Sequence, residues 1–167
     1  EVFSGLHEWL PAELAAEAVG WMELIAMQRG LRPRDEGAIR DLLGFDLAAA
    51  RALEAAGDRL AALRRHEVIV RSYTGLADTT ESERAAARLS ADPETREARK
   101  DEARWLEYEA TARQRFADAY AWLQQGESAP SPAEFRIALG LRSIEKHAEA
   151  PGVEGLTARR LLATLFA

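Results

Sequence analysis

The longest stretch free of helix-breaking residues in this chain lies between Pro93 and Gly126. Asp92 is a favoured helix N-cap, Pro93 fits the first helical position, and Glu94 places negative charge in the first turn. Neither Gly nor Pro recurs before Gly126, which supplies the stop. The sequence therefore predicts one helix over about residues 93–125, which would be roughly 50 Å long. A helix of this length exceeds the core of a small domain, so other elements must pack along it.

The apolar side chains of this predicted helix gather in its second half. Before Trp105 the segment is almost entirely charged, so we expect only the second half to enter a core. The predicted core stripe consists of Trp105, Leu106, Ala110, Phe116, Tyr120 and Leu123.

Further helices are predicted on both sides, because caps, glycine stops and apolar positions three and four apart recur along the chain. Gly44 is expected to end a short helix and Asp46 to cap the next one, with Gly57 inside it. Ser131 begins the clearest capping box, and Thr157 is expected to cap the last helix. The expected helices cover residues 11–29, 35–43, 46–73, 131–149 and 157–166.

These patterns predict an all-α fold, an antiparallel bundle of five to seven helices around the long central helix. At 167 residues the chain fits a single domain over 1–167. An N-terminal lobe over 1–73 and a C-terminal lobe over 93–167, joined by a flexible segment 74–92, is the alternative. Within that segment, a capping box starting at Thr80 would instead begin a short helix.

Composition removes several functional classes from consideration. The chain has no Cys, which excludes disulfides, thiol catalysis and cysteine-based metal sites. It has no apolar run of about 18 residues and no visible signal peptide, so we expect a cytoplasmic protein without membrane contact. A formal charge of −6 disfavours nucleic acid as a partner without excluding a local basic face.

No motif for a metal or a nucleotide is present. Helical di-iron sites use Glu-x-x-His pairs, but the residue three positions before each of the three histidines is not a carboxylate. Neither a phosphate-binding glycine loop nor a nucleophile elbow occurs. We therefore expect no metal and no cofactor.

One short pattern suggests ribonuclease chemistry. Residues 142–147 read Arg-Ser-Ile-Glu-Lys-His, which resembles the arginine–four residues–histidine signature of HEPN-type ribonucleases. The resemblance covers six residues. It implies an all-helical, usually dimeric ribonuclease in which Arg142 and His147 act on the RNA backbone.

A second pattern suggests DNA binding. Residues 39–53 place apolar side chains around Gly44 at spacings that suit a helix-turn-helix, and residues 135–141 repeat the first half of that pattern. Arg51 and Arg59 would then be the DNA-contacting candidates. A helical hairpin with a glycine corner is the alternative interpretation.

The favoured interpretation is a non-enzymatic interaction or regulatory protein that presents helical surfaces, as a homodimer or to another protein. The DNA-binding regulator is the second hypothesis and the HEPN-like ribonuclease the third. The candidate interface residues lie on the charged half of the long helix and on the apolar C-terminal segment: Arg96, Arg99, Lys100, Arg104, Leu162, Leu165 and Phe166.

Overall fold

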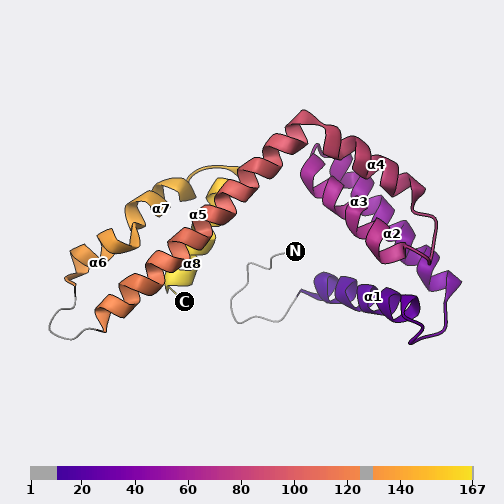
Figure 1. Ribbon diagram of the computed structural model, residues 1–167, viewed down its shortest axis with the longest axis horizontal. Helices are drawn as coiled ribbons and strands as arrows, with labels where there is room; N and C mark the ends of the chain where they lie inside the picture. Colours follow the sequence, from indigo (N-terminus) through magenta and orange to yellow (C-terminus); the bar gives the residue numbers. More distant parts are fainter. Residues whose placement is uncertain (1–10, 125–129, 167) are drawn as a thin grey trace. The chain divides into compact units, whose positions relative to one another are not determined.

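A computed structural model describes residues 11–124 and 130–166, apart from the side chains of Glu13 and Phe166. Every regular element in these residues is an α-helix, which confirms the predicted all-α class (Figure 1). The described part of the chain holds eight helices, where five to seven were predicted. They are α1 (Ala12–Gln28), α2 (Glu36–Ala55), α3 (Arg59–Tyr73), α4 (Thr80–Ala91), α5 (Pro93–Leu123), α6 (Pro132–Leu139), α7 (Leu141–Ala148) and α8 (Gly152–Phe166).

The chain divides into two compact units, and the division falls within α5 between Ala98 and Arg99. In unit 1, α3 lies beside α2 and α4 (Figure 1), and α1 adds Leu24 to the core that α2 and α3 share. In unit 2, α7 packs along α8, and Ala112 of α5 joins the buried cluster between them.

The predicted long helix is confirmed, because α5 runs without interruption for 31 residues. Its start is fixed by Asp92, whose carboxylate accepts hydrogen bonds from the amide and the hydroxyl of Thr95, both at 3.0 Å. The predicted stop at Gly126 lies outside the described residues.

The face that α5 buries differs from the predicted stripe. Leu106 and Tyr120 are exposed by 55% and 63%, whereas Ala112, Ala119 and the carboxylate-bearing Glu109 are buried. Small side chains at the buried positions let α7 and α8 approach, and Glu109 tolerates burial because Arg160 and Arg113 pair with it. Trp105 and Phe116 of the predicted stripe do lie in the core, so large apolar residues alone predicted only part of the buried face.

The break between the second and third helices lies at Gly57 and not at Gly44, so both glycine predictions were wrong. Gly44 lies inside α2, with nothing within 4 Å of the position that a Cβ would take. Gly57 adopts a left-handed φ of 78°. The amides of Gly57 and Asp58 donate to carbonyls of the last turn of α2, a C-cap that requires a positive φ at Gly57. Asp58 then caps α3 by accepting from the Ala61 amide at 3.1 Å.

Asp46, predicted to be a cap, instead lies within α2 and joins a half-buried polar cluster. Its carboxylate accepts a hydrogen bond from the Tyr73 hydroxyl at 2.8 Å and pairs with Arg65 at 2.6 Å. Arg65 also reaches Glu17 of α1 at 3.1 Å. The cluster therefore connects α1, α2 and α3, and it satisfies the hydroxyl of the fully buried Tyr73.

In the C-terminal region, the end of the first predicted helix and the start of the last one differ from the prediction. The capping box at Ser131 is confirmed, but the helix ends at Gly140, which has a φ of 67°, and α7 follows directly. The last helix begins at Gly152, so Thr157 is a buried residue within α8 and the predicted cap was wrong. At Gly155 a Cβ would lie 1.8 Å from the Ala150 carbonyl oxygen, so only glycine fits this start of α8.

Residues 80–91 form α4, so the helix predicted for this segment is present. The start differs by one residue from the predicted box, because Thr79 is the N-cap and the Thr80 amide donates to Asp78 at 2.9 Å. The helix packs against α3 through Leu89, Ala62 and Leu63.

Candidate functional site

A buried polar network in unit 1 is centred on His66. Its side chain lies on the buried face of α3 and is 1% exposed. The ring atom Nε2 lies 3.0 Å from Glu54 Oε1 on α2, and Nδ1 lies 3.1 Å from Ser82 Oγ on α4. An ionised Glu54 can only accept, so in a neutral ring Nε2–H donates to it and Nδ1 accepts from the Ser82 hydroxyl. One imidazole thus connects three helices.

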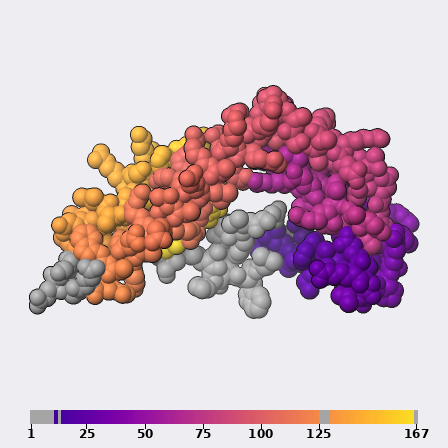
Figure 2. Space-filling model, viewed as in Figure 1, coloured from indigo at the N-terminus to yellow at the C-terminus, as the bar shows by residue number. Residues whose placement is uncertain are grey.

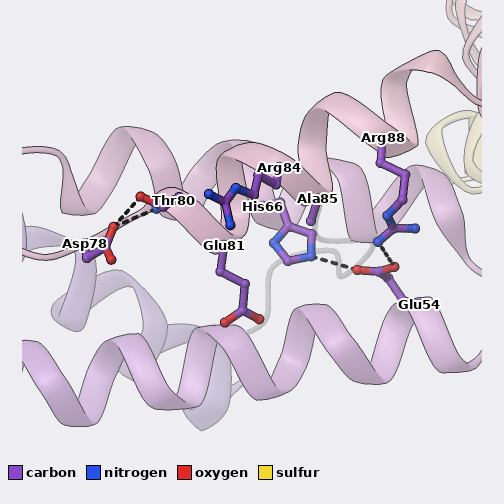
Figure 3. A pocket seen from close by; sticks show the side chains of 8 residues that line it. All are labelled: Glu54, His66, Asp78, Thr80, Glu81, Arg84, Ala85 and Arg88. Carbon is purple, nitrogen blue, oxygen red and sulfur yellow. Dashed lines mark hydrogen bonds and ion pairs between the residues drawn. The ribbon is translucent and has the colours of Figure 1, made fainter.

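Glu54 carries a second partner at the mouth of this site. The Arg88 guanidinium donates to Glu54 Oε2 at 2.5 Å, and Figure 3 shows this pair beside the His66 ring. The hydrogen bond from Arg88 is the largest cause of a lowered Glu54 pKa; burial opposes it, and the His66 bond adds to it. Glu54 therefore stays ionised well into the acid range.

A shallow hollow of about 580 Å³ opens beside His66 (Figure 3). Acidic and basic groups alternate around it, and several are paired, as Arg51 is with Glu81 through two nitrogens. This mixture of charges does not favour a strongly anionic or cationic ligand. The lining residues are Glu54, His66, Asp78, Thr80, Glu81, Arg84, Ala85 and Arg88.

Ser82, His66 and Glu54 are the residue types of a nucleophilic triad. Their geometry decides whether they could act as one. A catalytic serine must present its hydroxyl oxygen to a substrate carbonyl next to oxyanion donors. Ser82 is 1% exposed, so a substrate cannot reach its Oγ. The arrangement stabilises the packing of α2, α3 and α4, and it is not assembled for acyl transfer.

Sequence reasoning missed this network, although one signal was present. His66 falls on the same helix face as Ala62, Ile69 and Tyr73, positions that are all buried. A histidine on a buried stripe requires polar partners from neighbouring helices. Those partners could be named only with the correct break between α2 and α3 at Gly57, and the break was predicted at Gly44.

The structure does not bring Arg142 and His147 together. Both lie on α7, five residues apart, and therefore on different sides of that helix. Arg142 borders a hollow at the α6–α7 corner. The ring centroid of His147 lies 5.0 Å from that of Trp105 and 5.4 Å from that of Tyr108, both in edge-on contact. Its Nδ1 lies 2.8 Å from Glu154 Oε1. The HEPN-like function stays a prediction, and unchanged RNA cleavage after a His147→Ala substitution would dispose of it.

The two DNA-contacting candidates are both held in ion pairs. Arg51 binds Glu81, and Arg59 pairs with Asp92 and Glu94 at the start of α5. The turn that a helix-turn-helix requires at Gly44 is absent, because α2 continues through it. DNA binding stays a prediction, but the corner that suggested it does not exist in α2.

The remaining candidates lie on α5 and α8. Arg96, Arg99, Lys100 and Arg104 are exposed on α5, and Arg104 pairs with Asp101 at 3.1 Å. Leu162 and Leu165 are half-buried against the unit 2 core, and the side chain of Phe166 lies outside the described residues. A role for these residues in an interface stays a prediction.

The described residues contain neither a metal-binding cluster nor a membrane-spanning helix. No group of three or more His, Asp or Glu side chains among them could hold a metal ion. None of the described helices combines the length and the apolar composition that a membrane span requires.

No protein-family model matches the chain, and neither a curated protein nor a solved structure does. Its function must therefore be inferred from its own residues.

Proposed function

We propose that this chain is a non-enzymatic interaction or regulatory protein that presents helical surfaces and acts as a homodimer. The observation that carries the proposal is the exposure of large apolar side chains on its helices. On α1, Val19, Trp21 and Met22 are exposed by 58%, 52% and 63%, and on α6 Ile137 is exposed by 79%. Val19 and Met22, three residues apart, lie on one side of α1, and exposed apolar groups that lie together are typical of surfaces that another protein covers.

The α1 helix is unusual in composition as well as in exposure. Its 17 residues include no Lys and no Arg, and most are apolar. Only part of this apolar surface serves the core, which α1 reaches through Leu24 and Met27. On the outer part, Val19, Trp21 and Met22 each remain exposed by more than half.

The polar clusters of the described residues support an interaction role over a catalytic one. Ser82 is inaccessible beside His66, and Glu109 is occupied by two arginines. Side chains committed to such pairs are poorly placed to bind and transform a substrate.

Co-expression of two differently tagged copies of the chain tests the proposal. Capture of one tag should recover the other in comparable amount. Separately purified copies, mixed and then captured at once, provide the control for association after lysis. If neither procedure recovers the second tag, the self-association in the proposal is wrong.

A further inference from the structure

The α6–α7 corner in unit 2 combines an apolar hollow with ordered charges. The hollow measures about 660 Å³ and is bordered by Ile137, Leu141, Arg142 and Glu145. Ile137 is exposed by 79%, more than any other large apolar residue described. In Figure 2 the atoms coloured for α6 and α7 lie at the surface. An exposed β-branched residue beside an apolar hollow is a feature that a protein partner would cover.

The charges on the outer face of α7 alternate in a self-complementary order. Arg142, Glu145, Lys146 and Glu149 are all exposed, and they follow one another at intervals of three, one and three residues. This spacing places them on one face of the helix and its C-cap. Two such faces that meet antiparallel, centred between Glu145 and Lys146, bring Arg142 opposite Glu149 and Glu145 opposite Lys146. Every cross-pair then joins opposite charges.

Within a single copy, the same face contains two unfavourable pairs. Arg142 and Lys146 are like charges four residues apart, and so are Glu145 and Glu149. Pairs of this kind destabilise an isolated helix by a few tenths of a kcal/mol. Within one copy Glu145 also lies 3.4 Å from Arg136 of α6. A second copy in antiparallel orientation supplies each of the four side chains with a further opposite charge.

We propose that two copies of this chain associate through the α6–α7 corner, about a twofold axis between Glu145 and Lys146 of the paired α7 helices. The inference rests on the self-association in the proposed function and assigns the surface for it. In this register the Ala150–Pro151 turn of one copy faces Gly140 and Leu141 of the other, which line the hollow beside Ile137. The interface is isologous, as expected for most homodimers.

Charge reversal tests the register directly. Arg142→Glu places a glutamate opposite Glu149 at each end of the interface, and Glu149→Arg places an arginine opposite Arg142 at each end. Each single variant should weaken the dimer by ~10-fold or more at low salt, and less at 1 M salt. The double variant, Arg142→Glu with Glu149→Arg, restores opposite charges and should return the dissociation constant close to that of the unaltered chain. Sedimentation equilibrium measures the constant, and circular dichroism checks that helix content is unchanged.

The apolar half of the interface has its own test. Ile137→Asp should weaken association, whereas Leu31→Asp should not, although Leu31 is similarly exposed at 75%. Met22→Glu tests whether two copies associate through α1 instead.

The outcomes distinguish the α7 register from the self-association itself. Weakening by both single charge variants with recovery in the double variant supports the α7 register. A double variant as weak as the singles, or a dimer that only Met22→Glu dissociates, overturns this register while the proposed self-association stands. A chain that is monomeric at every concentration overturns both.

Discussion

Two glycine-to-alanine substitutions should change the stability of unit 1 in opposite directions. Gly44 lies in an exposed position inside α2, and Gly57 holds a φ of 78° after its end. At neither position does anything lie within 4 Å of the Cβ that alanine adds. Steric contact is therefore the same for both, and only the backbone conformation distinguishes them.

The expected magnitudes follow from that conformation. Alanine in the interior of a helix is more stable than glycine by about 0.5–1 kcal/mol, because glycine loses more backbone entropy on folding. In the left-handed region alanine costs roughly 1–2 kcal/mol. Gly44→Ala should therefore raise the free energy of unfolding and Gly57→Ala should lower it, with about 1.5–3 kcal/mol between the two variants.

Urea denaturation followed by circular dichroism measures both values. The midpoint of Gly44→Ala should lie above that of the unaltered chain and the midpoint of Gly57→Ala below it, with equal slopes. If α2 ended at Gly44 and continued through Gly57, the two signs would be exchanged. A stabilising Gly57→Ala would therefore refute the helix boundaries described above.

Three further substitutions test the buried polar groups. Ser82→Ala leaves His66 Nδ1 without its partner and should cost about 1–3 kcal/mol in the free energy of unfolding, measured by urea denaturation; a neutral result would contradict the network. Tyr73→Phe removes the hydroxyl that donates to Asp46 at 2.8 Å and should cost about 1.5–3 kcal/mol in the same assay. An unchanged midpoint would mean that the bond contributes nothing. For Glu109, burial raises the pKa, but the bonds from the two paired arginines outweigh it and hold the pKa below the ordinary 4.5. Its stabilisation is present above pH 4.5 and lost as the pH falls through the lower folded-state pKa, so Glu109→Gln should flatten the decline of stability in that range. Parallel pH profiles for the two proteins would contradict this assignment.

Local signals in the sequence predicted the elements that local chemistry determines. The capping box at Ser131 and the start of α5 after Asp92 both depend on residues within three positions of one another. The absence of Gly and Pro along α5 likewise depends on the segment alone. The all-α class followed from these signals, since every segment favoured a helix.

The choice between the two glycines depended on packing that the sequence does not display. Both Gly44 and Gly57 precede an aspartate within two residues, so each resembles a stop followed by a cap. Asp46 is drawn into α2 by Tyr73 and Arg65, which lie about 20 to 27 residues later. Tertiary contacts of this kind override a local cap preference.

The candidate site was missed for the same physical reason. Glu54, His66 and Ser82 lie on three helices, and their meeting depends on how those helices align. Glu109 was not part of the predicted core stripe of α5, yet Arg160, 51 residues later, makes its burial possible. Side-chain pairs across helices could be proposed only after the helix boundaries were known.

The molar mass of the unaltered chain in solution is the most direct test of the account. Light scattering over a hundredfold range of concentration should give twice the chain mass of 18.4 kDa at the upper end, with a reversible decline on dilution. A mass of 18.4 kDa throughout that range would contradict the homodimer on which the proposed function depends.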